Sequence, residues 1–212
     1  GSTIVACSGL TVDCSTPSFG QGFMELMSSD SELFKNDPEY LILAERFEDF
    51  ILPLETVSDT VLEGLSERFA DYIMQIRSIR SKMTGHIFIH DLCSVRPFLS
   101  SFYDAIAHRG LIEKAIIQMN ETLAKLCQEL PDCTILPIGR LVSDIGVQSA
   151  DPKKYWLLAR FPFGPKFTPR YHRLLAGAIM ALNGSSARGL VLDLDNTLWG
   201  GVIGDDGTFG VQ

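Results

Sequence analysis

Short, continuously apolar runs recur along the chain and are separated by longer stretches with a different hydrophobic period. Three of these runs lie at 40–44, 86–90 and 134–136, and a fourth lies near the end at 189–193. Runs of this length are typical of strands that are buried on both faces of a parallel sheet. A weaker alternation of apolar and polar residues at 10–14 is compatible with one more short strand.

The stretches between the runs place apolar residues every three or four positions, which is the period of an amphipathic helix. Thr56 and Asp59 match a capping box at the start of the first helix, and Pro169 occupies the favoured first turn of the last one. The predicted helices run from Thr56 to Gly85, from 111 to 130 and from Pro169 to 182, with a short one at 23–27. Alternating strands and helices predict an α/β fold, a three-layer parallel sheet with helices on both faces.

Composition and charge limit the classes of protein to which the chain can belong. Of its 212 residues, 46% are hydrophobic and 21% are charged, which is ordinary for a soluble globular protein. The net charge of -8 argues against nucleic-acid binding, which needs a basic surface. No apolar stretch has the length of a membrane span and no secretory signal is recognisable, so we expect a cytoplasmic protein without a membrane partner. The five cysteines are odd in number and lack metal-ligand spacing, which predicts reduced thiols.

Two carboxylates stand where the fourth apolar run ends, at Asp193 and Asp195. Ligands of parallel α/β sheets bind at the carboxyl ends of strands, where Asp193 can attack phosphorus and Asp195 can move the leaving group's proton. A magnesium ion on these carboxylates would offset their repulsion from a phosphate. Asn196, Thr197 and the turn amides are candidates for holding phosphate oxygens. For a bare DxD pattern, a strand that simply ends in a polar turn is the better explanation.

The match is longer than a bare DxD. The segment 190–207, LVLDLDNTLWGGVIGDDG, resembles the first catalytic motif and following turn of the FkbH-like branch of the haloacid-dehalogenase (HAD) superfamily. Other segments resemble, more weakly, the SGNH-like and flavodoxin-like domain that precedes this motif in FkbH-like proteins; they are 19–22, 31–34, 37–38, 120–123, 151 and 155–156. The resemblance implies an SGNH-like domain over 1–184, with its first strand missing or replaced. Residues 185–212 would then be a linker and the first strand and turn of a HAD-type Rossmann-like domain.

The resemblance also implies a function. FkbH-like proteins are associated with a HAD phosphatase and acyltransferase activity that loads a glyceryl unit from 1,3-bisphosphoglycerate onto an acyl carrier protein in polyketide-type biosynthesis. The expected partners are therefore a phosphorylated three-carbon acyl donor and an acyl carrier protein, and the expected cofactor is Mg²⁺. Two alternatives remain: a degenerate SGNH-like module that docks the carrier protein, and a generic small-molecule phosphatase. A basic patch of Arg77, Arg80 and Lys82 is a candidate docking surface.

The chain departs from the family pattern near its end. It stops shortly after Gly207, before the positions where a HAD protein has its phosphate-binding Ser or Thr, its Lys and its later acidic pair. Because one carboxylate pair is a weak anchor for magnesium, we expect this 212-residue chain to have no phosphatase activity and no tightly bound Mg²⁺.

Nucleophiles of the SGNH-like part are not marked by a motif. Ser8 and Ser15 are candidates by residue type only, because neither lies in a GDS-like context. His172 lies where an SGNH domain has its DxxH element, but Pro169 replaces the Asp, so we expect no Ser–His–carboxylate line there. Cys93, in the loop after a strand, is a tentative acyl acceptor. The other candidates, His86, His90, His108 and Cys127, are interpreted as ordinary strand-end, loop or core residues.

Overall fold

The structure is a computed structural model. It describes residues 13–15, 26, 28, 31–35, 37–50, 59–93, 102–150 and 163–184. The elements in chain order are α3 (Glu32–Lys35), β1 (Tyr40–Leu43), the 3-10 helix η1 (Phe47–Phe50), α4 (Asp59–Lys82), β2 (His86–His90), α5 (Phe102–Glu129), β3 (Cys133–Leu136), α6 (Ile138–Ile145), α7 (Val147–Ala150) and α9 (Phe167–Leu182). The chain divides into two compact units, Gly1–Ala176 and Gly177–Gln212. The assignment of domains to 1–184 and 185–212 stays a prediction.

The three central apolar runs form one parallel sheet in the order β1-β2-β3. Tyr40 lies opposite His86, and Ile87 lies opposite Cys133. The strand at His86–His90 is the predicted one, whereas β1 ends and β3 begins one residue earlier than predicted. The prediction of a parallel α/β sheet is therefore confirmed for the described residues.

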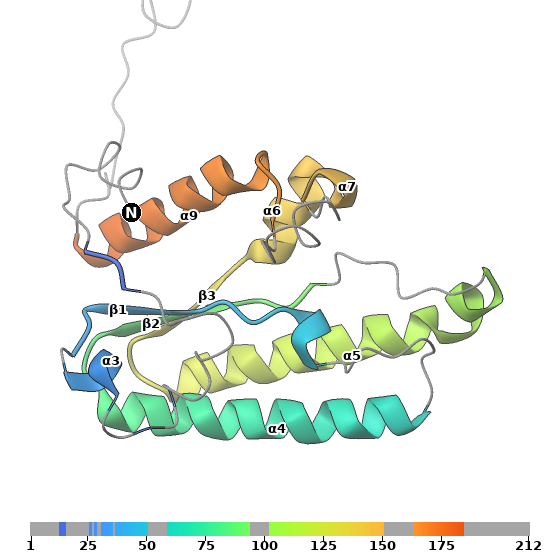
Figure 1. Ribbon diagram of the computed structural model, residues 1–212, viewed down its shortest axis with the longest axis horizontal. Coiled ribbons are helices and arrows are strands. Elements are labelled where there is room, and N and C mark those ends of the chain that lie inside the picture. Colours follow the sequence, from blue (N-terminus) through green and yellow to red (C-terminus); the bar gives the residue numbers. More distant parts are fainter. Residues whose placement is uncertain are drawn as a thin grey trace, which may run out of the picture. The chain divides into compact units, whose positions relative to one another are not determined.

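Helices α4 and α5 cover one face of this sheet, as Figure 1 shows. Both connections between neighbouring strands run in the same direction across the sheet, and right-handed crossovers then put both helices on the same side. The interface is a core of buried side chains from both helices and from alternate strand positions; it includes Leu41, Leu43, Ile76, Ile79, Ile87, Ile89, Leu123 and Leu126. Burying each such side chain contributes about 1.5–3 kcal/mol, so this layer dominates the stability of the sheet.

The other strand positions face the opposite side of the sheet, since side chains alternate along a strand. Phe88 is fully buried there, with the rings of Tyr40 and His86 at centroid distances of 6.0 and 4.8 Å. Tyr171, in the first half of α9, meets the same face at His90, with ring centroids 5.3 Å apart. An aromatic column thus links β2 to the start of α9.

A compact turn between α4 and β2 fixes the amino-terminal edge of the sheet. Arg80 donates hydrogen bonds to the carbonyl groups of Met83 and Gly85, which lie just beyond the end of α4, and so holds the turn that leads into β2. A side chain at Gly85 would collide with the carbonyl oxygens of Pro38 and Glu39, so only glycine lets β2 begin this close to β1. Gly85 is therefore needed for strand pairing, whereas α4 ends three residues earlier than predicted, at Lys82.

Several boundaries differ from the prediction. Helix α5 begins at Phe102 rather than at 111, so Gly110 and His108 lie inside a helix and not in a loop. A single glycine costs a helix only about 1 kcal/mol, which good helix formers on both sides overcome. Helix α9 begins two residues before Pro169, which leaves the proline in the first turn, and it ends at the predicted position, Leu182, followed by Gly184 with a φ of 68°.

The segment at 10–14 is only partly described. Asp13 and Cys14 are exposed and belong to no strand, so the predicted strand does not extend over them. The predicted strand at 189–193, the capping residue Thr56 and all of 23–27 except Leu26 lie outside the described residues. None of the helices in the described ranges combines the length and apolar composition that crossing a membrane requires.

Candidate functional site

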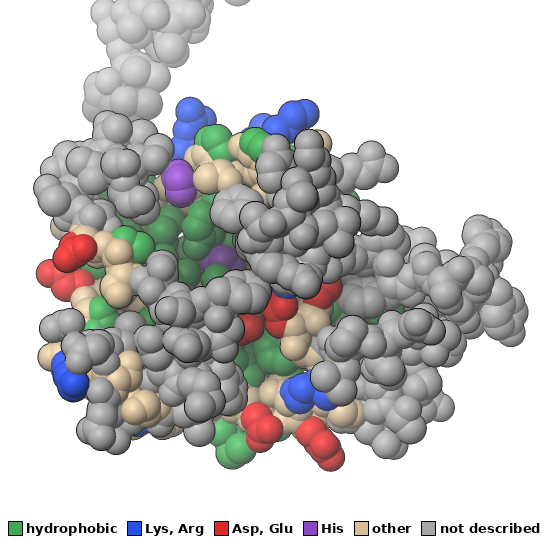
Figure 2. All heavy atoms as spheres, in the orientation of Figure 1, with side chains coloured by type: hydrophobic (Ala, Val, Ile, Leu, Met, Phe, Trp, Pro, Cys, Tyr) green, Lys and Arg blue, Asp and Glu red, His purple; other side chains and the backbone are tan. Residues whose placement is uncertain are grey.

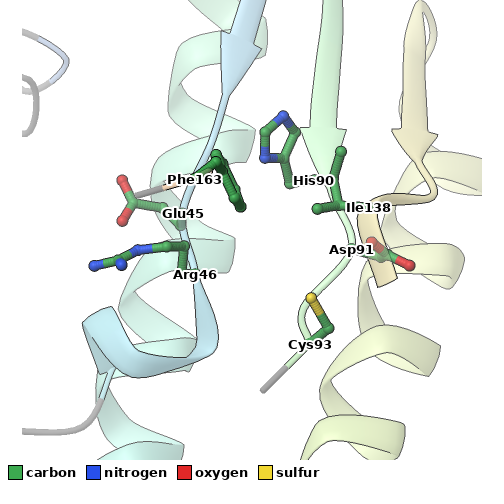
Figure 3. A pocket seen from close by; sticks show the side chains of 7 residues that line it. All are labelled: Glu45, Arg46, His90, Asp91, Cys93, Ile138 and Phe163. Carbon is green, nitrogen blue, oxygen red and sulfur yellow. The ribbon is translucent and has the colours of Figure 1, made fainter. Parts of the chain in front are cut away.

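A small pocket lies at the carboxyl edge of the sheet (Figure 3). Its residues directly follow or end each of the three strands, together with one aromatic residue from just before α9. They are Glu45, Arg46, His90, Asp91, Cys93, Ile138 and Phe163. Parallel strands bring their carboxyl ends to one edge, which is where α/β proteins bind ligands.

Asp91 ties the end of β2 to the start of α6. Its Oδ1 accepts a hydrogen bond from the Gly139 N–H at 2.9 Å, an arrangement in which a carboxylate satisfies a free amide of the first helical turn. Burial raises the pKa of Asp91, while the amides of Gly139 and Ile138 oppose this rise. A Cβ atom on Gly139 would lie 3.3 Å from Asp91 Oδ2, so glycine permits the close approach.

Asn120 of α5 holds the next residue of the same loop. Its Oδ1 accepts from the Leu92 N–H and its Nδ2 donates to the Leu92 carbonyl, both at 2.8 Å. The two bonds replace the strand ladder that ends at His90, and Leu92 is buried. The loop that carries Asp91 and Cys93 is therefore held from both sides.

His90 and Tyr171 form a neutral polar pair beside the pocket. His90 Nε2 and the Tyr171 hydroxyl are 2.9 Å apart, and His90 is only 3% exposed. Burial lowers the pKa of His90 to about 4, and burial is also the largest cause that raises the pKa of Tyr171 to about 12. Both side chains are uncharged at neutral pH, so His90 can accept or donate a hydrogen bond but cannot attract an anion by its charge.

Cys93, the tentative acyl acceptor, points into the pocket in Figure 3. Burial, followed by the negative charges of Asp91 and Glu48, raises the pKa of its thiol to about 12. Nucleophilic attack requires the thiolate, which these surroundings disfavour. The role of Cys93 stays a prediction without support from its environment.

His172 is half-buried on α9, and its ring lies 6.4 Å from that of Tyr171. Within the described part of the chain, no serine is hydrogen-bonded to it. Ser15 lies in an exposed irregular segment. Among the residues that the structure describes, no three His, Cys, Asp or Glu side chains gather in a way that could hold a metal ion.

The phosphoryl-transfer candidates Asp193, Asp195, Asn196 and Thr197 lie outside the described residues, as does Ser8. Their predicted roles in catalysis, metal binding and phosphate binding therefore stay predictions. The structure instead brings together His90 and Asp91, which sequence reasoning missed. The available signal was a carboxylate directly after an apolar strand, the same signal that singled out Asp193.

The basic patch predicted at the end of α4 is engaged in contacts within the chain. Arg77 pairs with Glu129 of α5 at 2.5 Å, and Lys82 lies 5.3 Å from the centre of the Phe34 ring. Arg80 donates hydrogen bonds to the carbonyl groups of Met83 and Gly85. These three side chains stabilise the fold around α4, which makes them poor candidates for a docking surface.

Comparison with known proteins gives one informative likeness. The chain matches no protein-family model and no curated protein. Its structure is similar to the crystal structure of the N-terminal part of protein BF1531 from Bacteroides fragilis, which contains a phosphatase domain and is complexed with Mg. The TM-score is 0.74 at 19% sequence identity, over 94% of this chain and 52% of that one.

The chain has an α/β fold that is similar to the matched half of that protein. It spans about half the length of the BF1531 structure. At this level of identity the likeness establishes the fold alone, which agrees with the parallel sheet and flanking helices described above.

Proposed function

We propose that this chain belongs to a Mg²⁺-dependent phosphoryl-transfer enzyme of the HAD type. The observation that carries the proposal is the segment 190–207, in which an apolar run ends in Asp193-Leu194-Asp195-Asn196-Thr197. Support comes from the fold, which is similar to a protein that contains a phosphatase domain and binds Mg. A short motif and a fold are independent observations, so together they carry more than either one alone.

The chemistry follows from the two carboxylates. Asp193 would attack the phosphorus atom and form an aspartyl phosphate, while Asp195 would give a proton to the departing oxygen and later take one from water. Carboxylate oxygens are the hard ligands that Mg²⁺ prefers, so Asp193 and Asp195 fit the ion, which would neutralise charge on the phosphate. Asn196 and Thr197 would hold the remaining phosphate oxygens.

The finer proposal is an FkbH-like enzyme that transfers a glyceryl unit from 1,3-bisphosphoglycerate to an acyl carrier protein. In this proposal residues 1–184 form a three-layer, flavodoxin-like domain of SGNH type, and 185–212 begin the HAD domain. The proposed donor carries two phosphates. Asp193 would attack the phosphate ester at one end, while the thiol of the carrier would attack the acyl carbonyl at the other end and displace the second phosphate as the leaving group.

One observation favours a non-catalytic role for the α/β part as a carrier-docking module. Among the described residues that line its pocket, Cys93 is a thiol, His90 is neutral and bound to Tyr171, and Asp91 is engaged by α6. A hydrolase or transferase of the SGNH type would need a base beside its nucleophile. The two roles are compatible, with chemistry at Asp193 and docking elsewhere.

The test is an assay of the protein that contains this chain, at its full length. We expect Mg²⁺-dependent release of phosphate from a phosphorylated three-carbon acyl donor, together with a glyceryl-sized mass increase on the carrier protein. Phosphate release from many unrelated phosphate esters, without a mass increase on the carrier, would support the generic phosphatase instead. Absence of any Mg²⁺-dependent turnover would reject the proposal.

A matched pair of variants locates the chemistry. Asp193→Asn removes the nucleophile and one metal ligand at almost constant volume, and should lower turnover by at least about 10³-fold. Asp71→Asn makes the same chemical change at an exposed position of α4 and should leave turnover within about twofold. Equal activities of the two variants would show that Asp193 is not the nucleophile.

A further inference from the structure

Positive charge is concentrated in one stretch of an otherwise acidic chain. Between Asp151 and Asp193 there is no Asp or Glu, whereas this stretch holds seven of the chain's 18 Lys and Arg residues. Three of the seven lie in the described part of the chain: Lys166 in the turn before α9, and Arg170 and Arg173 in its first two turns. All three side chains are exposed.

The three cations lie on one side of α9. Their spacings of four and three residues bring them to neighbouring positions along a helix surface. With a rise of about 1.5 Å per residue, they form a row about 10 Å long. The buried side of the helix carries Phe167 and Leu175. Figure 2 shows Lys and Arg side chains over α9, at the top of the view.

This arrangement is unfavourable for the helix itself. The amino-terminal turns of a helix carry partial positive charge and favour acidic side chains, and like charges three or four positions apart repel. Within the described residues, no carboxylate forms an ion pair with Lys166, Arg170 or Arg173. In contrast, Arg77 forms an ion pair with Glu129. Charges that destabilise their own helix and form no ion pair within the described residues point to a binding role.

We infer that Lys166, Arg170 and Arg173, the α9 basic face, dock a surface of the carrier protein that is rich in carboxylates. This inference rests on the proposed function, which supplies the carrier as partner. A row of cations on the convex surface of a helix suits an extended row of carboxylates. A single small phosphate would instead need donors that converge on one point. The chain's net charge of -8 opposes nucleic acid more strongly than a carrier protein, because nucleic acid carries a denser and longer row of negative charge than a protein surface.

The test compares two charge-reversal variants of the full-length protein. Arg170→Glu with Arg173→Glu reverses the α9 basic face, and Lys114→Glu with Lys125→Glu makes the same net change at exposed positions of α5. Titration of each with fluorescently labelled carrier protein at low and moderate salt gives the affinity. We expect the α9 variant to bind at least tenfold more weakly at low salt and the α5 variant to bind within twofold of the unmodified protein.

Two further measurements separate docking from folding. The melting temperature of the α9 variant should stay unchanged or rise, since acidic residues suit the start of a helix. A carrier whose Asp and Glu residues at the docking surface are changed to Lys should bind the α9 variant better than it binds the unmodified protein. If both charge reversals weaken carrier binding equally, the effect comes from the net charge alone, and the inference is overturned.

The outcomes also separate this inference from the proposed function. Mg²⁺-dependent phosphate release by the unmodified protein tests the proposed function without any carrier present. If phosphate is released but carrier affinity is the same for the α9 variant, docking at the α9 basic face is wrong and the proposed function stands. Binding of a labelled DNA duplex or of phosphatidylserine vesicles as tightly as the carrier would identify the wrong class of partner and would also overturn the inference.

Discussion

Replacing Asn120 should destabilise the domain by removing both hydrogen bonds that hold Leu92. In Asn120→Ala the Leu92 N–H and carbonyl each lose a partner at 2.8 Å, next to a side chain that is only 2% exposed. A buried polar group left without a partner costs about 1–3 kcal/mol. Because Asn120 itself is half-buried, water can reach part of the vacated space, so we take the lower half of this range for each group.

Alanine is the better helix former and offsets up to about 0.7 kcal/mol of this cost, so the free energy of unfolding should fall by about 2 kcal/mol. For a chain of this size, that loss corresponds to a decrease in melting temperature of about 4–8 °C. Urea unfolding followed by circular dichroism measures the loss, and Gln118→Ala, at an exposed position of the same helix, is the matched control. A loss for Asn120→Ala no larger than for Gln118→Ala would refute the assignment of Asn120 as the anchor of this loop.

Three further predictions concern backbone space, protonation and thiol reactivity. Gly85→Ala should lower the free energy of unfolding by more than about 3 kcal/mol, because its Cβ would collide with the carbonyl oxygens just before β1. Gly177→Ala, with open space around it, should stabilise α9 by about 0.5–1 kcal/mol. Urea unfolding compares the two variants. Folding keeps His90 neutral with a pKa of about 4, while the unfolded side chain binds a proton near pH 6.5, so stability should decline by up to about 3 kcal/mol as the pH falls from 6.5 to 4. The His90→Gln variant should show a flatter decline over this range, and parallel profiles would contradict the assignment. Alkylation at pH 7.5, followed by peptide mass spectrometry, should modify exposed Cys14 well before Cys93, whose pKa burial raises to about 12; equal rates would contradict its burial.

The sheet was predictable because its strands are short and apolar on both faces. The run at 86–90 is bounded by Gly85 and Asp91, and the strand occupies the predicted residues. The start of α5 was missed because Gly110 suggests a break in the helix, although Ser101 and Asp104 have the spacing of a capping box at the observed start, Phe102. Helix boundaries depend on such small free energies that tertiary packing decides them.

The pocket could not be predicted because its residues are far apart in the sequence. Glu45, Asp91 and Ile138 meet only through the strand order β1-β2-β3, which the hydrophobic pattern does not specify. The interpretation of His90 as an ordinary strand-end residue followed from residue type alone. Its burial beside Tyr171 depends on α9, which lies 81 positions further along the chain at the point of contact.

The strand order also has a consequence for how the chain assembles. Among the described strands, β2 pairs with β1 and β3 pairs with β2, and the two crossovers, 44–85 and 91–132, have the same length. The entropic cost of closing each loop is therefore equal, since it depends mainly on loop length. A chain emerging from the ribosome can add β2 to β1 and then β3 to β2 without waiting for a later segment. During synthesis, the unpaired edge of β2 is therefore exposed only until α5 and β3 have been made.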